Sequence, residues 1–196
     1  MRFYKFISTI LHPVVLPTIS VMLYFLLTPN NLTSDKKLTI LGLIFTVTYL
    51  IPLLILILFR KLKIIKSYET HSIKERKLPV GLMIILFYLL GNTIDNIGSL
   101  GLLFYATSLG LLLIYLLFFL NIKASVHLLS LGLLLGFFMV LSNVYSHSYI
   151  LLIILIFILS GILGSARLHL KAHTTREIYI GFFVGLIAPL AINFIL

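Results

Sequence analysis

The chain has no cysteine and no tryptophan, and it has few acidic residues. Without cysteine, neither a disulfide framework nor a thiolate metal site can form. Asp and Glu together contribute 5 of the 196 residues, and only 10% of the chain is charged, whereas about a quarter of a soluble domain is charged. The sequence therefore lacks the polar surface that a water-soluble globule of this size needs.

The chain is instead rich in long apolar stretches. It is 61% hydrophobic with a mean hydropathy of +1.19, so lipid must cover the surface that a core cannot hide. About 20 apolar residues cross the ~30 Å hydrocarbon core of a bilayer. By this criterion we place about seven spans, with six as the alternative, near residues 10–28, 38–59, 79–94, 98–120, 125–144, 149–166 and 177–196. Lipid offers the backbone no hydrogen-bond partner, so the sequence predicts one all-α, polytopic transmembrane bundle.

Two of these assignments have alternatives. The start of the chain resembles a secretory signal, but Pro13 and Pro17 interrupt its apolar stretch and no small-x-small cleavage site follows, so we interpret it as a retained first span. Residues 91–98 are typical of a turn between two spans. A re-entrant or tilted pair over residues 79–120 is the other interpretation.

The cations lie on one side of the predicted bundle. Of the 15 Lys and Arg, all but Lys36 and Lys37 belong to the amino terminus or to the loops 60–78, 121–124 and 167–176, which seven spans place together. Basic loops between apolar runs indicate lipid phosphates or membrane orientation, not nucleic acid. The positive-inside rule puts this side in the cytoplasm, so we expect a multi-pass protein of the inner (cytoplasmic) cell membrane. The oligomeric state stays open.

Small residues predict which helices pack closely. Three segments carry pairs of small residues four apart: Gly132 and Gly136, Ser160 and Gly164, Gly161 and Ser165, and Gly181 and Gly185. This spacing lets helix backbones approach each other in lipid. We expect a core of four helices, formed by these three segments and 38–59.

The ends of the same helices carry ionisable residues, which are costly in lipid and tend to be functional. His173 and Glu177 are four apart, so the carboxylate can hold one imidazole nitrogen and leave the other free to attack. Arg167 adds a planar cation suited to phosphate oxygens. Ser125 is a favoured cap at a helix start, where free N–H groups attract anions, and His127 lies beside it.

Other basic residues have two interpretations. Lys74, Arg76 and Lys77 precede Pro79 and are either a topology signal or phosphate ligands. For His12 we favour a capping or interfacial role. His71 and His147 are interpreted as unremarkable interfacial residues.

With these residues the chain resembles the type 2 phosphatidic acid phosphatase superfamily, the membrane relatives of vanadium haloperoxidases. The family motifs are KxxxxxxRP, PSGH and SRxxxxxHxxxD. Arg167, His173 and Glu177 match the spacing of the third motif, with Glu for Asp. Ser125 and His127 match the second, one helical hairpin earlier, with Val for Gly and Ala for Pro. The first motif is approximated only by the segment 74–79.

The resemblance implies a role for each matching residue. His173 is expected to take the phosphoryl group as a phosphohistidine, Glu177 to orient it, and His127 to protonate the leaving oxygen. Arg167, Ser125 and the cations of 74–77 are expected to hold the phosphate oxygens. No metal and no other cofactor is expected. The substrate implied is a lipid phosphate or diphosphate whose head group enters a basic cup at the membrane surface, with its tail along the bundle in lipid.

Three other functions compete with a lipid phosphatase. His169, His173 and Glu177 lie on one helical stripe, a spacing seen in metal sites, although no second set of ligands completes a cage. The altered motifs also fit a non-catalytic relative that binds lipid or a protein partner. A transporter is disfavoured, because the spans carry almost no polar residues at mid-depth.

Overall fold

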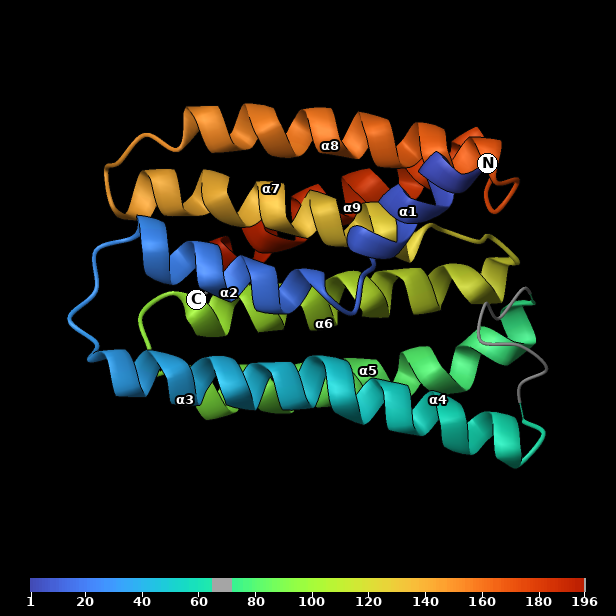
Figure 1. Ribbon diagram of the computed structural model, residues 1–196, viewed down its shortest axis with the longest axis horizontal. Helices are drawn as coiled ribbons and strands as arrows, with labels where there is room; N and C mark the ends of the chain where they lie inside the picture. Colours follow the sequence, from blue (N-terminus) through green and yellow to red (C-terminus); the bar gives the residue numbers. More distant parts are fainter. Residues whose placement is uncertain (65–71, 196) are drawn as a thin grey trace.

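Six apolar helices are long enough to cross a membrane in the part of the chain that the computed structural model describes, residues 1–64 and 72–195 (Figure 1). The first is a continuous helical segment of α3 (Ser34–Phe45), the π-helical turn η1 (Thr46–Leu50) and α4 (Ile51–Lys61). The others are α5 (Ile73–Ile94), α6 (Leu100–Leu117) with its 3-10 extension η2 (Phe118–Leu120), α7 (Val126–Val144), α8 (Ile150–His169) and α9 (Thr175–Ile195). The chain is thus an all-α, multi-pass membrane protein, and the predicted fold class is confirmed.

The span expected at 10–28 is not one helix. A short helix α1 (Arg2–Ile10) is separated by a bend from α2 (Leu16–Leu27), whose 12 residues are too few to cross a bilayer alone. Pro13 lies in the bend, and a proline ring supplies no N–H and clashes with the preceding turn. α1 exposes Phe3, Phe6 and Ile10 and packs against the end of α8, so it lies on the outside of the bundle (Figure 1).

The segment 79–120 forms two full-length antiparallel helices (Figure 1). α5 begins six residues earlier than expected, because the Ser72 hydroxyl accepts a hydrogen bond from the Glu75 N–H and caps the helix. Gly98 has a φ of 54° in the turn between the helices, a conformation that glycine adopts without strain. Both helices are long and apolar enough to cross a membrane, which fits the interpretation as a turn between two spans.

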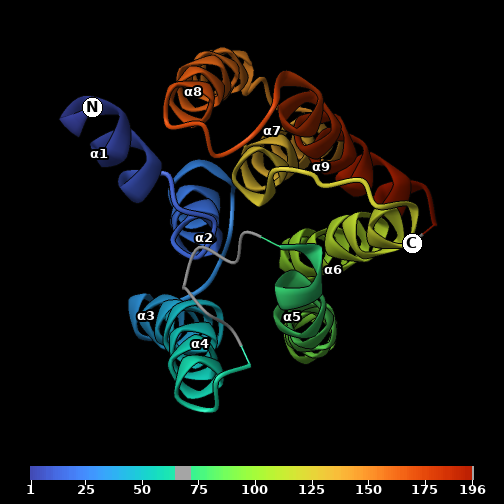
Figure 2. The same cartoon turned by 90° about the vertical axis from the view of Figure 1, so that its right-hand side faces the viewer.

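The prediction that the segment 38–59 belongs to the core of the bundle is wrong. α6 and α7 contribute more buried apolar residues than any other two helices, and α9 and α8 pack against α7. The segment α3–α4 buries few side chains and lies at the edge of the bundle, away from α7–α9 (Figure 2). It is as apolar as the core helices, and hydropathy does not distinguish a helix that faces lipid from one that faces other helices.

α7 and α9 are in direct backbone contact, as their small residues predict. A Cβ atom added to Gly132 would overlap the Phe182 carbonyl of α9, and one added to Gly185 would overlap the Leu129 carbonyl of α7. α8 differs, because a Cβ on Gly161 would meet nothing within 4 Å. The small residues of α8 therefore do not all mark a helix contact.

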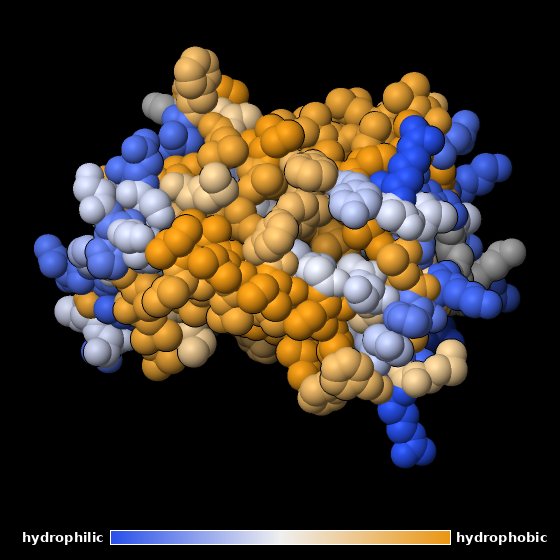
Figure 3. Space-filling model, turned by 90° about the horizontal axis from the view of Figure 1, so that it is seen from above, coloured by the Kyte–Doolittle hydropathy of each residue, from blue (hydrophilic) through white to orange (hydrophobic). Residues whose placement is uncertain are grey.

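The loops follow the predicted sidedness. The amino terminus, the end of α4, the start of α5 and the connections α6–α7 and α8–α9 lie at one end of the bundle, which we call the basic end (Figure 1). Among the described residues, Lys36 and Lys37 at the start of α3 are the only Lys or Arg at the other end. An apolar band separates the two hydrophilic ends (Figure 3).

The α7–α9 contact gives a first prediction. Gly132→Ala should destabilise the protein by about 1–3 kcal/mol, because the added methyl group must separate two backbones. Thermal unfolding in detergent micelles measures this. Gly161→Ala is the matched control in α8, where the methyl group meets open space and helix propensity improves. Equal losses in the two variants would contradict the contact.

Candidate functional site

His173 and Glu177 form a tight pair at the start of α9. His173 Nδ1 lies 2.6 Å from Glu177 Oε2, and the His173 side chain is 3% exposed. The Glu177 backbone N–H donates to the Thr174 hydroxyl, so the turn that carries the carboxylate is itself capped. Because Nδ1 faces a carboxylate oxygen, it carries the proton, and Nε2 of the neutral imidazole keeps its lone pair.

The start of α7 is bound directly to the start of α9. The Ser125 backbone N–H donates to the Glu177 carbonyl over 2.9 Å, and Gly181 lets the Ser125 carbonyl approach α9. Ser125 is fully buried, and its hydroxyl accepts from the Leu128 N–H at 3.5 Å. This contact fixes the position of His127 relative to His173, although 46 residues separate them in the chain.

A polar cavity of about 260 Å³ opens between these helix starts, and we call it the head cavity. Four predicted site residues line it: Arg76, His127, Arg167 and His173. They come from α5, α7, α8 and the loop before α9. The structure thus brings both imidazoles and two guanidinium groups to one small space.

The head cavity is suited to an anion. Arg167 Nη1 donates to the Ser8 hydroxyl at 2.8 Å, and Arg76 Nη1 donates to the Ala124 carbonyl at 3.5 Å. None of the described residues that line the cavity is acidic, so its walls carry positive charge only. Nε2 of His127 is buried and has no hydrogen-bond partner among the described residues. A buried polar atom of this kind needs a partner, and an oxygen of a bound ligand supplies one.

His173 is neutral at neutral pH. Burial lowers the pKa of its imidazole, and the charges of Arg76 and Arg167 lower it further, against the opposing effect of Glu177. The pKa of His12 is also lowered, first by burial and then by the charge of Arg167. A neutral imidazole is the form that can act as a nucleophile.

Sequence reasoning missed the amino-terminal wall of the head cavity. Ser8, Thr9 and His12 line it, and the His12 ring meets the His127 ring edge-on, with centroids 5.1 Å apart. His12 Nδ1 also accepts from the Val14 N–H at 3.4 Å inside the bend, but it does not cap α2, whose N-cap is Val15. No spacing links these residues to the motifs. The available signal was a histidine next to a proline bend on the basic side.

Three predicted phosphate ligands do not line the head cavity. Ser125 uses its hydroxyl as a helix cap, Lys74 is exposed, and Lys77 Nζ lies 4.8 Å from the centre of the Phe119 ring. Lys77 therefore makes a cation–π contact on another face of α5. Of the basic cluster before Pro79, only Arg76 reaches the cavity.

The remaining histidines lie elsewhere. His169 stacks on Tyr4 of α1, with centroids 4.4 Å apart, rather than joining His173 and Glu177. Within residues 1–64 and 72–195, no group of three or more His, Cys, Asp or Glu side chains is placed to hold a metal ion. His147 is at the opposite end, and His71 lies outside the described residues.

Comparison of the chain with protein-family models, with curated proteins and with solved structures finds no match in any of the three.

The lowered pKa of His173 gives a second prediction. Between that pKa and 6.5, the unfolded chain binds a proton that the native chain does not, so the free energy of unfolding should fall as the pH drops below 6.5. Each tenfold difference in proton affinity is worth about 1.4 kcal/mol. His173→Asn should flatten this dependence in thermal unfolding between pH 5 and 8. An unchanged slope in His173→Asn would contradict burial of a neutral imidazole.

Proposed function

We propose that the chain is a metal-independent lipid phosphatase of the type 2 phosphatidic acid phosphatase kind, acting through a phosphohistidine. The observation that carries the proposal is the head cavity, which places His127, His173, Arg76 and Arg167 around a space of about 260 Å³ with no acidic side chain in its described walls. A phosphate monoester fits the charge and the size of this space.

His173 is the nucleophile in the proposed reaction. The Glu177 carboxylate accepts a hydrogen bond from Nδ1–H, with 2.6 Å between Nδ1 and Oε2, so Nε2 is the nitrogen that is free to react. Nε2 attacks phosphorus and forms a nitrogen–phosphorus bond as the ester oxygen–phosphorus bond breaks. Glu177 also stabilises the positive charge that develops on the ring. The longer side chain of Glu, where the family motif has Asp, reaches the imidazole without difficulty.

His127 supplies the proton to the leaving alcohol. Its buried Nε2 has no partner among the described residues and is therefore available to a ligand oxygen. A bound phosphate brings negative charge beside this ring and favours its protonated form. After the alcohol leaves, the neutral His127 takes a proton from water, which then attacks the phosphohistidine and releases inorganic phosphate.

Arg76 and Arg167 stabilise the transferring phosphoryl group. Fixed guanidinium groups at the nonbridging oxygens offset the charge that a metal ion offsets in other phosphoryl transfers. Arg167 is held by Ser8, and Arg76 by the Ala124 carbonyl directly before the α7 cap. Both cations are therefore positioned before substrate binds.

The membrane position of the head cavity favours a lipid substrate. The cavity is lined by the basic-end parts of α5, α7 and α8, and an apolar band adjoins the hydrophilic surface at this end (Figure 3). The excess of Lys and Arg at this end supports a cytoplasmic orientation in an inner cell membrane. Phosphatidate, phosphatidylglycerol phosphate, a polyprenyl diphosphate and a lipid A phosphate all carry the required phosphate.

One observation favours a second function, that of a non-catalytic lipid-binding relative. Val126 lines the head cavity at the position where the family motif has glycine, so a side chain is present where the family has none. The same arginines would then bind a lipid phosphate without turnover.

A third prediction tests the proposed function. Phosphate release from a panel of lipid phosphates by the purified protein should persist in EDTA and be inhibited by vanadate. His173→Ala should lower the rate by about 10³-fold or more, and His127→Ala by about 10²–10⁴-fold. His169→Ala is the control, because this histidine ends α8 four residues before His173 but stacks on Tyr4 outside the cavity.

Activity that survives both cavity variants would refute the proposed roles. Vanadate or phosphate binding without any hydrolysis would favour the non-catalytic function. Activity abolished by EDTA would refute the metal-free mechanism.

A fourth prediction separates Arg76 from its neighbours. Arg76→Ala should lower kcat/KM by at least about tenfold, because its charge-assisted contact with phosphate is lost. Arg76→Lys should not restore the full rate, because lysine lacks the planar pair of donors. Lys74→Ala and Lys77→Ala should each change kcat/KM by less than about threefold, since neither residue lines the cavity. Equal losses in all three alanine variants would indicate a general surface charge effect.

A further inference from the structure

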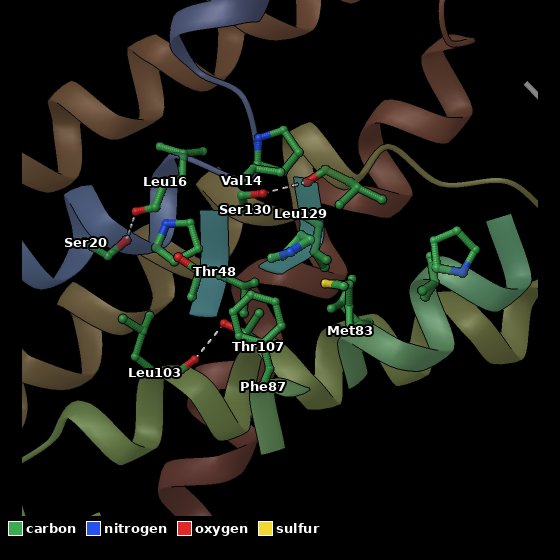
Figure 4. A pocket seen from close by; sticks show the side chains of 18 residues that line it. Val14, Leu16, Ser20, Thr48, Met83, Phe87, Leu103, Thr107, Leu129 and Ser130 are labelled. Carbon is green, nitrogen blue, oxygen red and sulfur yellow. Dashed lines mark hydrogen bonds between the residues drawn. The ribbon is translucent and has the colours of Figure 1, made fainter. Parts of the chain in front are cut away.

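A second cavity, apolar and about 140 Å³ in volume, adjoins the head cavity; we call it the tail cavity (Figure 4). Pro13, Pro79, Val80 and Val126 line both cavities, so one begins where the other ends. The tail cavity lies among α2, η1, the start of α4, α5, α6 and α7. Most of the side chains that line it are apolar, Leu129 among them. An amphiphile that places its phosphate in the head cavity therefore has an apolar space directly next to it.

Irregular helices produce the tail cavity. Four of the chain's 6 prolines line it: Pro13, Pro17, Pro52 and Pro79. Pro52 follows the π-helical turn η1 and cannot donate to the Thr48 carbonyl one turn before it. Such interruptions bend helices away from close packing. The cavity is thus lined by prolines from the α1–α2 bend and from three different helices.

The hydroxyl groups of the tail cavity are nearly all satisfied. Ser20, Thr107 and Ser130 each donate to a carbonyl of their own helix, as the dashed lines in Figure 4 show. Thr48 is the exception, because its hydroxyl is buried without a partner among the described residues. The cavity therefore offers one free donor, and a ligand with several polar groups would leave most of them without a hydrogen bond.

We propose that the tail cavity binds the first carbons of a single hydrocarbon chain attached directly to the phosphate in the head cavity. The inference rests on the proposed function and names its substrate class: phosphate or diphosphate monoesters of long-chain alcohols. A volume of about 140 Å³ is close to that of an engineered apolar cavity of about 150 Å³ that binds benzene, so it holds the carbons next to the head group. The remainder of the tail lies in lipid.

A glycerolipid phosphate fits this arrangement less well. Its phosphate is attached to a branched glycerol with two ester groups, which would occupy the same position as the apolar carbons. Two ester groups carry several acceptors, and the Thr48 hydroxyl matches only one of them. The unmatched groups would lose their hydrogen bonds to water on entering the cavity.

The test compares two matched variants on two lipid substrates. Ser20→Leu fills the tail cavity, and Ser160→Leu fills the space between α8 and α9. Both serines are buried, and both donate to the carbonyl four residues earlier at 2.8 Å. Rates of phosphate release are measured on dodecyl phosphate, dilauroyl phosphatidate and glycerol 3-phosphate in detergent micelles. Thr107→Leu fills the tail cavity from the opposite wall and replaces Ser20→Leu if that variant does not fold.

The wild-type protein should prefer dodecyl phosphate to dilauroyl phosphatidate by about tenfold or more in kcat/KM. Ser20→Leu should reduce the ratio of rates on dodecyl phosphate and glycerol 3-phosphate by about tenfold, whereas Ser160→Leu should leave this ratio unchanged. Equal preference for the two lipids, or an equal effect of the two variants, would overturn the inference while the proposed function stands.

A second measurement decides the inference even if no hydrolysis occurs. A diazirine-bearing alkyl phosphate is photo-cross-linked to the His173→Ala protein, and the labelled peptides are identified by mass spectrometry. Labelling of α2, α5 and α6 supports the tail cavity. Labelling confined to α8 and α9 overturns it. Absence of hydrolysis in the wild-type protein with labelling at the tail cavity would refute the phosphatase and retain the binding site.

Discussion

The contact between α7 and α9 is the constraint on which the site depends. Gly132 and Gly185 let the two helix backbones meet, and at the basic end the Ser125 N–H donates to the Glu177 carbonyl. This hydrogen bond joins the residue that caps α7 to the residue that holds His173. A side chain larger than glycine at these positions would move the helices apart, and the spacing of the two imidazoles would change with them. The geometry of the proposed reaction is therefore set by packing inside the membrane.

The amino-terminal segment supplies the remaining walls of the site that α7 and α9 position. α1 is too short and too amphipathic to span a bilayer, yet Ser8 holds Arg167 and His12 stands against His127. The bend at Pro13 then directs α2 into the bundle, where it forms one wall of the tail cavity. One irregular segment of chain thus contributes to a charged space and to an apolar one. Their shared boundary is what an amphiphile requires, because its charged and apolar parts lie within a few bonds of each other.

Part of the site could be predicted from the sequence because its residues are linked by short spacings. The spacing of four between His173 and Glu177 places them within reach of each other at a helix start, and the serine before His127 is a favoured cap. Which residue of the basic cluster 74–77 reaches the site was harder to predict, because successive residues of a helix point in different directions. Arg76 faces the head cavity, while Lys77 meets Phe119 and Lys74 faces outward. The spacing of these residues alone did not predict which side of α5 faces the head cavity.

The sequence by itself determined that the chain is an all-α membrane bundle with its cations at one end, because hydropathy and charge act on each segment separately. Only the tertiary structure decided that α6 belongs to the core in place of α3–α4, that α1 and His12 border the site, and that an apolar cavity adjoins the polar one. In lipid, apolar side chains are equally stable facing a neighbour or the bilayer, so hydropathy does not record helix neighbours. Which helices become neighbours depends on how their surfaces fit: glycine allows two helix backbones to come into contact, and proline prevents such contact.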